Sequence, residues 1–395
     1  MVNAKHDVTS YESCNCKREI FDANALYDAY LKAKQGSDWK PQVQKFEMTY
    51  LLSIAKIQKE LENHTYELKP GTKFKLRERG KERLITGEQI EDRIVKHALC
   101  DEVLNPALRK YLIYDNGASL KGRGITFTRK RLETHLHKFY REYGNDGYIL
   151  LMDFSKYYDN IRHDKLIEIY ERYVSDETAL WLLKKTTNKA KVDVSYMSDE
   201  EYADCMNVLF NSLEYDKRNK VLDKPKERKY MYKHLNIGDQ TAQAAGIAYP
   251  IPLDNYIKIV RGVKYYGRYM DDSYVIDQDK EYLKDLRTDI IRVAACLGIT
   301  VNTNKTRICR LSDYWRFLQI QYSLTDTGRV IRKINPKRLT TMKRKMKKLV
   351  KILPEDEFEN WYKAWFRNQY KCMSRQQRIN MDKLYTELKG GYENV

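Results

Sequence analysis

The sequence lacks any long apolar run, and none approaches the roughly 18 residues that a membrane-spanning helix requires. It also lacks internal repeats and low-complexity linkers, so neither a repeat array nor a disordered spacer is expected as its main architecture. These absences favour a globular protein without a membrane partner. We expect a cytoplasmic location.

Cysteine is also sparse, with seven residues in the chain. Cys14 and Cys16 are close together, but a C-x-C pair with no second pair nearby is poor spacing for zinc. An odd number of cysteines without a signal peptide is typical of reduced thiols in the cytoplasm. The sequence also lacks the Cys/His cluster that an HNH-type endonuclease would need.

Positive charge is abundant. The chain has 73 Lys and Arg against 55 Asp and Glu, which gives a net charge of +18 and a pI near 9.3. A surplus of this size indicates a polyanionic partner, most simply nucleic acid. The 32 tyrosines would suit a groove that stacks bases between phosphate contacts. With 395 residues and 42% hydrophobic content, we expect two or three packed subdomains.

Apolar periodicity predicts a helical N-terminal extension over residues 1–66, and a break follows at Pro70-Gly71. Five apolar residues are placed near one face of its last helix, namely Leu51, Leu52, Ile54, Ile57 and Leu61. A second helix is predicted across Glu88–Leu104, ending before Pro106.

Between these helices, the segment Thr72–Ile85 alternates basic and apolar side chains. Lys73 and Lys75 fall on one side, and Phe74 falls on the other. The run at 78–81 is typical of a turn, so the segment predicts a β-hairpin with one strongly basic face.

The central part of the chain predicts a sheet. A hydrophobic strand over Tyr148–Met152 leads into Asp153, and a helix is predicted from Asp164 to Lys185. Residues 186–235 are polar and weakly periodic, which favours an insertion. Two further strands, Lys264–Tyr269 and Ser273–Ile276, are predicted on either side of an acidic turn.

The region after Asn335 is predicted to be helical and very basic. Eight of the fifteen residues in Lys337–Lys351 are Lys or Arg. Four apolar residues recur between them at helical spacing, namely Leu339, Met342, Met346 and Leu349. Such a helix could pack through its apolar stripe and contact phosphates through its cationic flank. The alternative is a solvated helix face, which is the favoured explanation for an isolated charge run.

Three acidic residues stand out by their context. Asp153 lies at the end of a buried-type strand, and Asp271 and Asp272 lie side by side in the turn between two strands. Nucleotidyl transfer needs rigid, exposed carboxylates that hold two Mg²⁺ ions, because the transition state spreads charge over phosphoryl oxygens. The alternative is a solvated Asp-Asp turn, since Asp is a favoured turn residue.

The residues around these acids resemble a known family. Tyr269-Met270-Asp271-Asp272 is similar to the YxDD motif of reverse transcriptases, and Leu151–Asp159 is similar to their preceding aspartate motif. The resemblance extends over residues 68–350. It implies an α+β, right-hand polymerase fold. The expected parts are an N-terminal extension (1–66), fingers (67–147), a palm with an antiparallel sheet (148–323, insertion about 186–235) and a basic helical thumb (324–395).

The resemblance also implies roles for individual residues. Asp153, Asp271 and Asp272 would bind two Mg²⁺ ions, for which Mn²⁺ could substitute, and the backbone carbonyl of Phe154 would join the coordination. Tyr158 falls at the position that excludes a ribose 2′-hydroxyl, or it simply packs in the core. The further nucleotide-binding candidates are Lys75, Arg83, Ile237, Gly238 and Lys305. The nucleic-acid-binding candidates are Tyr269, Met270, Gln243, Lys343, Arg344 and Lys347.

One loop departs from the pattern of most relatives. The segment 237–243 resembles their QGxxxSP loop, but Ile237 replaces Gln, Ala242 replaces Ser and Gln243 replaces Pro. The form [I/V/L]GxxxSQ is similar to the low-fidelity enzymes of diversity-generating retroelements, and some antiphage-defence reverse transcriptases also carry a final Gln. Because the side chain of Ile237 cannot hydrogen-bond a nucleotide, low fidelity is a hypothesis for this chain. Phe317-Leu318-Gln319 resembles the FLG primer-grip motif, with Gln in place of Gly.

The sequence therefore predicts an RNA-directed DNA polymerase of a bacterial retroelement, which adds dNTPs to a primer 3′-hydroxyl. Its expected partners are an RNA template and a DNA primer or product, with a structured noncoding RNA and an accessory protein as further candidates. Two alternatives stay open: a defence enzyme with protein-primed or untemplated synthesis, and a non-catalytic RNA-binding module. No RNase H domain is expected after the thumb.

Overall fold

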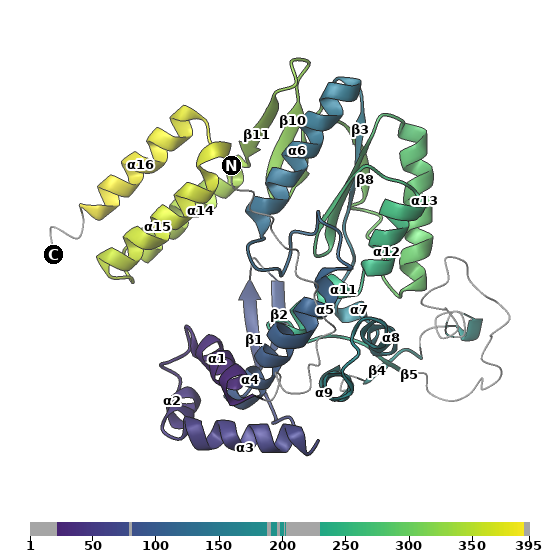
Figure 1. Cartoon of the computed structure of the whole chain (residues 1–395). Coiled ribbons are helices and arrows are strands. Elements are labelled where there is room, and N and C mark those ends of the chain that lie inside the picture. Colours follow the sequence, from purple (N-terminus) through teal and green to yellow (C-terminus); the bar gives the residue numbers. More distant parts are fainter. Residues whose placement is uncertain are drawn as a thin grey trace, which may run out of the picture. The chain divides into compact units, whose positions relative to one another are not determined.

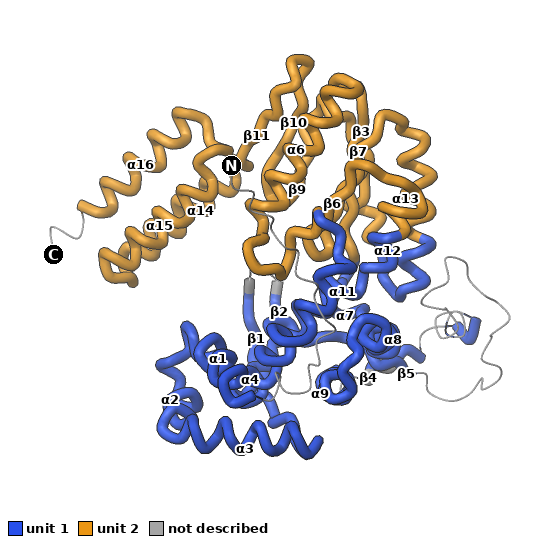
Figure 2. Tube along the Cα trace, in the orientation of Figure 1, with its two compact units in different colours: residues 1–114, 155–255, 292–300 blue, residues 115–154, 256–291, 301–395 orange. Residues whose placement is uncertain are grey.

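The computed structural model describes residues 22–78, 81–187, 191–195, 198–200, 202 and 230–390. The chain divides into two compact units, each built from three separate stretches (Figure 2). Unit 1 comprises residues 1–114, 155–255 and 292–300, and unit 2 comprises residues 115–154, 256–291 and 301–395. Cys14, Cys16 and most of the predicted insertion at 186–235 lie outside the described residues.

Unit 1 is mainly helical and includes two small two-stranded antiparallel sheets (Figure 1). Its elements are α1 (Ala23–Lys34), α2 (Pro41–Glu47), α3 (Tyr50–Glu62), β1 (Thr72–Glu78), β2 (Lys81–Gly87), α4 (Ile90–Ala98), the π-helix η1 (Leu99–Leu104), α5 (Asn105–Arg109), α7 (Tyr157–Asn160), α8 (His163–Tyr173), α9 (Glu177–Thr187), β4 (Lys191–Asp193), β5 (Tyr230–Tyr232), α11 (Gln240–Ala248) and α12 (Ile251–Asn255).

The strands of the predicted basic hairpin are confirmed. β1 and β2 pair antiparallel, with Lys75 opposite Leu84 and Leu76 opposite Arg83. Phe74 and Leu76 on the apolar side are still about half exposed, at 47% and 46%. The hairpin therefore presents side chains to solvent on both faces over its described residues.

The N-terminal helices follow the prediction in part. α3 buries Ile54, Ile57 and Leu61, which recur at helical spacing. Leu51 and Leu52 were predicted to share this face, but they are 67% and 76% exposed. Both lie in the first turn of α3, which the buried stripe does not reach, so the prediction is wrong for these two residues.

Two predicted helix ends are also wrong. The helix predicted to stop before Pro106 continues through η1 into α5, because Pro106 occupies the first turn of α5, where its missing N–H is tolerated. The single helix predicted over Asp164–Lys185 is two helices, α8 and α9. Val174 leaves the helical conformation (φ −113°, ψ 120°), and the Asp176 side chain caps α9 by accepting from the N–H of Ala179 at 2.7 Å.

Unit 2 contains two antiparallel sheets and a helical C-terminal region (Figure 1). Its elements are α6 (Ile125–Tyr143), β3 (Tyr148–Met152), the π-helix η3 (Tyr256–Val260), β6 (Tyr265–Tyr269), β7 (Asp272–Asp277), α13 (Lys280–Cys296, whose last turn belongs to unit 1), β8 (Arg307–Arg310), β9 (Trp315–Phe317), β10 (Ile320–Leu324), β11 (Val330–Ile334), α14 (Pro336–Leu349), α15 (Glu355–Gln369), the 3₁₀ turn η4 (Tyr370–Cys372) and α16 (Arg375–Lys389).

The larger sheet has the strand order β6-β7-β3-β8, with every pair antiparallel. The predicted strands around the three acidic residues are confirmed as β3, β6 and β7. Ile149 and Leu151 of β3 pack in one cluster with Leu136 and Phe139 of α6. Alternation along β3 and helical spacing along α6 thus bring their apolar faces together.

The smaller sheet, β11-β10-β9, and the helices after it share the same hydrophobic core. α14 buries Leu339 and Met346 and packs Met342 and Leu349 against the core, as the sequence predicted. Leu318 and Gln319 form the two-residue turn between β9 and β10, both at positive φ (44° and 72°). A glycine favours this conformation, so the Gln that departs from the FLG motif lies in strained backbone. Among the described residues, no helix is long and apolar enough to cross a membrane.

Candidate active site

The β6–β7 hairpin positions two of the three acidic residues. Tyr269 pairs with Asp272, which leaves Met270 and Asp271 as a two-residue turn. Met270 has a φ of 54°, in the left-handed region that non-glycine residues rarely adopt. Arg268 is fully buried and donates a hydrogen bond to the carbonyl oxygen of Met270 at 3.2 Å. This arginine fixes the turn, and no sequence motif pointed to it.

The third acid lies at the end of the neighbouring strand. β3 pairs with β7 so that Met152 lies opposite Ser273, which places Asp153 and Asp272 at the same end of adjacent strands. The carbonyl oxygen of Asp153 accepts from the N–H of Asn302 at 2.8 Å. Phe154 forms an antiparallel bridge with Val301. The segment after β3 is therefore held by the segment that leads into β8.

The three carboxylates interact strongly with one another. The pKa of Asp272 is raised to about 7, first by burial and then by the negative charges of Asp271 and Asp153. Lys305 opposes this shift. The raised pKa therefore reflects mainly the burial of Asp272, and the negative charges of its two acidic neighbours add to it.

Lys305 is the cation that faces this group. Its Nζ donates to both carboxylate oxygens of Asp153, at 3.0 and 2.9 Å. The hydrogen bond to Asp153 raises the pKa of Lys305, and the charges of Asp272 and Asp271 add to the effect. The Lys305 side chain is 58% exposed, so water reaches its ammonium group.

Carboxylate oxygens are the hard donors that Mg²⁺ prefers, so the chemistry of this group fits a divalent cation. An added cation would also relieve the repulsion that raises the pKa of Asp272. In the described ranges, no three acidic, His or Cys side chains are already gathered in a metal-binding arrangement. Here the ammonium group of Lys305 is hydrogen-bonded to both carboxylate oxygens of Asp153.

A buried polar network supports β7 from α6. Asp115 accepts from Arg131 Nε at 2.5 Å, and His135 lies 3.4 Å from its other oxygen. Tyr274 of β7 shares a 3.0 Å hydrogen bond with His135 Nδ1. Burial alone would raise the pKa of Asp115, but the hydrogen bonds from His135 and Arg131 outweigh it and lower the pKa. Sequence reasoning missed this network, because its members carry no common motif.

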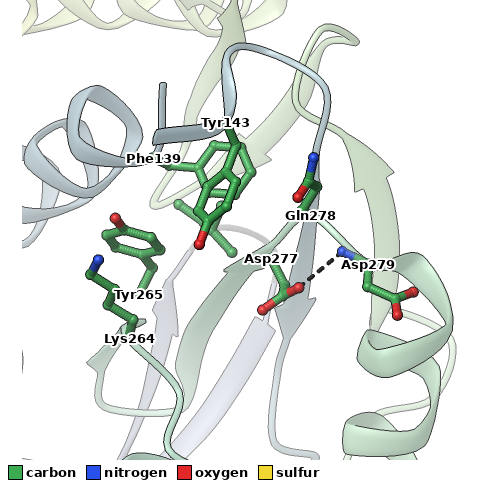
Figure 3. Close-up of a pocket in the computed structure, with 8 residues that line it drawn as sticks. Phe139, Tyr143, Lys264, Tyr265, Asp277, Gln278 and Asp279 are labelled. Carbon is green, nitrogen blue, oxygen red and sulfur yellow. Dashed lines mark hydrogen bonds between the residues drawn. The ribbon is translucent and has the colours of Figure 1, made fainter. Parts of the chain in front are cut away.

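The opposite end of β7 borders a pocket of about 380 Å³ within unit 2 (Figure 3). Phe139 and Tyr143 of α6 line one side, and Asp277 lies at the end of β7. The Asp277 carboxylate accepts from the N–H of Asp279 at 2.9 Å. β7 thus carries an aspartate at each end, and Asp272 lies next to the other two acids.

The nucleotide-binding candidates on the basic hairpin belong to unit 1. Lys75 forms a 2.9 Å ion pair with Glu82 across the two strands, and both side chains are well exposed. Arg83 lies in β2 opposite Leu76 and is also exposed. The hairpin therefore carries its basic groups on solvent-facing strands.

The loop around Gly238 lies in unit 1 as well. Gly238 has a φ of 104°, which favours glycine, and Asp239 caps α11 by accepting from the N–H of Thr241 at 2.9 Å. The chain before the loop is tied to Tyr158, whose carbonyl oxygen accepts from the N–H of Leu235 at 3.0 Å. Tyr158 is half-buried in α7.

Two more candidates belong to this loop and to the helix after it. Ile237 is half-buried, and Gln243 is exposed on α11. In unit 2, Arg344 and Lys347 are exposed on α14, and Lys343 is half-buried beside them. Tyr269 and Met270 are half-buried at the acidic turn. The candidate residues are thus divided between the two units.

Comparison with protein-family models identifies the class. Residues 68–322, more than half of the chain, match the model described as reverse transcriptase (RNA-dependent DNA polymerase). The chain therefore belongs to the reverse transcriptase family, and its helices and antiparallel sheets form the right-hand polymerase fold.

Other comparisons add little. No curated protein matches the sequence. Among solved structures, the chain is similar to a telomerase from Candida albicans, determined in complex with a TWJ fragment of telomeric RNA, at 13% identity and a TM-score of 0.41. The match covers 82% of this chain and 58% of that one, so this chain spans little more than half of the telomerase.

Proposed function

We propose that this protein is an RNA-directed DNA polymerase that adds dNTPs to a primer 3′-hydroxyl on an RNA template. One observation carries the proposal. The strained two-residue turn of the β6–β7 hairpin places Asp271 and Asp272 beside Asp153, at one end of a rigid sheet. Membership of the reverse transcriptase family supports the same chemistry.

Asp153, Asp271, Asp272 and the carbonyl oxygen of Phe154 would hold the metals. When bound, two Mg²⁺ ions, or Mn²⁺ in their place, would help ionise the attacking hydroxyl and neutralise charge on the triphosphate. The sheet would keep the carboxylates rigid, because β3 and β7 are paired up to the acids. Arg268 would keep the turn in its strained shape by holding the carbonyl of Met270.

Lys305 would act on the leaving group. In the reaction, the primer 3′-oxygen bonds to the α-phosphorus and loses its proton to solvent, while the bond to pyrophosphate breaks. Lys305 would leave Asp153 and bind the triphosphate instead. It would then donate a proton to the departing pyrophosphate oxygen. Its 58% exposure and its flexible stem suit such a movement.

The remaining candidates would bind the substrates. Lys75 and Arg83 would grip the triphosphate, because cationic donors bind phosphate oxygens strongly. Tyr158 would exclude the ribose 2′-hydroxyl, and Gly238 would let the backbone approach the nucleotide. Ile237 would leave the nucleotide without a side-chain hydrogen bond, which supports low fidelity.

The nucleic acid would be held mainly through its backbone. Lys343, Arg344 and Lys347 on α14 would bind duplex phosphates without reading sequence. Gln243, Tyr269 and Met270 would contact the template or the primer end. A bacterial retroelement or an antiphage-defence system is the proposed setting, with a noncoding RNA and an accessory protein as further partners.

The test is primer extension by the purified protein on an RNA template with a DNA primer, Mg²⁺ and dNTPs. Asp271→Asn should reduce extension by at least about 10³-fold, because it removes a ligand at the site of charge development. Asp277→Asn, at the opposite end of β7, is the matched control and should extend normally. Normal extension by Asp271→Asn would refute the assignment of the site. Sequencing of the products would report fidelity.

A further inference from the structure

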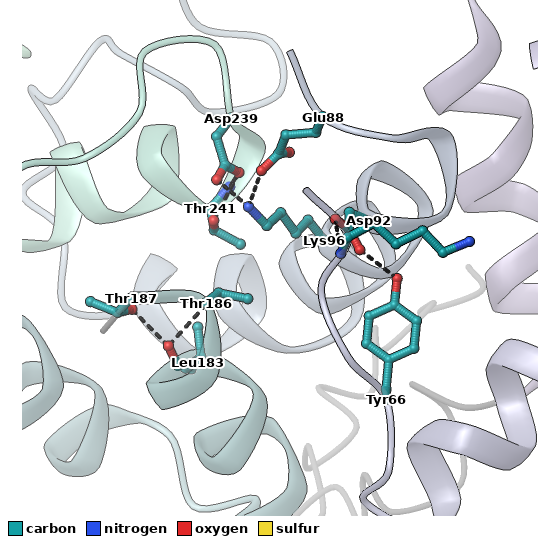
Figure 4. Close-up of polar contacts among 10 residues, drawn as sticks. Tyr66, Glu88, Asp92, Lys96, Leu183, Thr186, Thr187, Asp239 and Thr241 are labelled. Atoms are coloured by element: carbon teal, nitrogen blue, oxygen red, sulfur yellow. Dashed lines mark hydrogen bonds and ion pairs between the residues drawn. The ribbon is translucent and has the colours of Figure 1, made fainter. Parts of the chain in front are cut away.

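A buried lysine in unit 1 links two segments that are far apart in the sequence (Figure 4). Lys96 of α4 is 4% exposed, and its Nζ pairs with Asp239 at 2.5 Å and with Glu88. Glu88 follows β2 and lies close to Lys96 in sequence, whereas Asp239 is 143 positions away. The pair with Asp239 is therefore the long-range link between α4 and the Gly238 loop.

The charges explain why this link is strong. Burial alone would lower the pKa of Lys96, but the charges of Asp239 and Glu88 outweigh it and raise the pKa. Burial and the charge of Asp239 raise the pKa of Glu88 to about 7, because one ammonium faces two carboxylates. Lys96 therefore stays charged, and removing it would leave two carboxylates to repel each other.

The same aspartate shapes the loop. One Asp239 oxygen accepts from the backbone N–H and the hydroxyl of Thr241, at 2.9 and 2.8 Å, and its other oxygen accepts from Lys96. Gly238, next to it, has a φ of 104° and no atom within 4 Å of the position of a Cβ. Gly238 therefore offers the loop few side-chain contacts, and the hydrogen bonds of Asp239 to Thr241 and Lys96 hold the loop in place.

A pocket of about 520 Å³ lies over this link, within unit 1. Lys96, Glu88 and Asp239 line it together with Phe74 of β1, Ile237 and Gly238. The lysine thus lies beneath surfaces of both the basic hairpin and the Gly238 loop.

We propose that Lys96, through Asp239, is a positioning residue that sets the Gly238 loop against α4 and the base of the hairpin, and so controls nucleotide selection. The proposal rests on the proposed polymerase function. Lys96 does not itself touch the nucleotide. It acts by holding Gly238 and Ile237 where the incoming nucleotide would contact them.

The deciding variant is Asp239→Asn, because Asn caps a helix as well as Asp and removes part of the excess negative charge. The protein should fold normally. We expect the dNTP KM to rise about tenfold with kcat changed less than about threefold, a loss of binding before chemistry. The frequency of misincorporation should rise with it, and hydrogen–deuterium exchange at residues 238–241 should accelerate.

Two controls match the chemical change. Glu88→Gln removes the same excess charge but leaves the pair of Lys96 with Asp239. Lys165→Met removes another buried lysine, which pairs at 2.8 Å with Glu168 on its own helix. Both should keep the wild-type KM and the wild-type exchange at residues 238–241. Lys96→Met should resemble Asp239→Asn, and the double variant should be no worse than the more affected single variant. If Lys96→Met does not fold, Asp239→Asn alone decides.

Wild-type KM and exchange in Asp239→Asn would overturn the proposal, and so would an equal rise in KM in Glu88→Gln. Wild-type protein that fails to extend any primer would refute the proposed function instead. In that case the exchange at residues 238–241 still reports whether Lys96 and Asp239 hold the loop.

Discussion

Two clusters of the described residues, each with one lysine facing carboxylates, differ in how far water reaches the lysine. In unit 2, Lys305 faces Asp153 and its neighbours with its side chain 58% exposed. In unit 1, Lys96 faces Glu88 and Asp239 with its side chain 5% exposed. Both clusters carry an acid whose pKa is raised to about 7. An exposed lysine can be displaced by a substrate, whereas a buried one holds the fold.

The largest expected effect tests this difference through stability. Lys96→Met should lower the free energy of unfolding by about 3–5 kcal/mol, because it leaves buried carboxylates without their cation. Lys305→Met should lower it by less than about 1 kcal/mol, because water screens an exposed pair. Chemical denaturation of both variants measures the contrast. Equal losses would mean that burial does not separate the two clusters.

The second expected effect concerns activity. Lys305→Met should reduce kcat about 10²-fold with little change in the dNTP KM, because a proton donor to the leaving group would be lost. Lys284→Met is the matched control, since Lys284 is similarly exposed and pairs with Glu281 on α13. Single-turnover primer extension distinguishes the two. An unchanged kcat in Lys305→Met would leave the lysine with an electrostatic role toward Asp153 alone.

The smallest expected effect is a pH dependence of the buried cluster. Glu88 has a pKa of about 7 in the folded protein against an ordinary 4.5, so the folded state binds this proton more tightly than the unfolded state. Its contribution to stability is therefore present at low pH and is lost as pH rises through this window, at most about 1.4 kcal/mol per pH unit. The groups that set the shift are Asp239, Lys96 and Asp92.

Glu88→Gln removes this titration, so its stability relative to wild type should grow between about pH 4.5 and 7 and then level off. Thermal unfolding of both proteins across this range provides the measurement. A difference that does not change with pH would show that the carboxyl of Glu88 titrates below this range in the folded protein.

The local pattern of the sequence predicted much of unit 2. An apolar run identified β3, the two short segments beside the acidic turn identified β6 and β7, and helical spacing identified the buried stripe of α14. The acids could be found because a motif places them at strand ends. Helix boundaries were harder to predict: Pro106 suggested a stop, although the first turn of α5 accommodates it, and the cap at Asp176, which follows the break at Val174, was overlooked.

The supporting residues could not be predicted for a different reason. Lys96 and Asp239 are ordinary charged residues until the fold brings them together. Arg268 is likewise unremarkable in sequence, yet it is fully buried and holds the acidic turn. Which distant residues come into contact depends on tertiary packing. A short stretch of sequence does not contain that information. The pocket over Lys96 has the same origin, because its walls come from separate stretches of unit 1.

The interleaving of the two units has a consequence for synthesis on the ribosome. The last stretch of unit 1 ends at Thr300, whereas unit 2 needs residues to the C-terminus. β3 is made early, but its partners β7 and β8 begin at Asp272 and Arg307. The nascent chain must therefore carry an apolar strand with both edges unpaired while much of the remaining chain is translated. Such a strand is a natural binding site for a chaperone, and slow translation beyond β3 would prolong its exposure to aggregation.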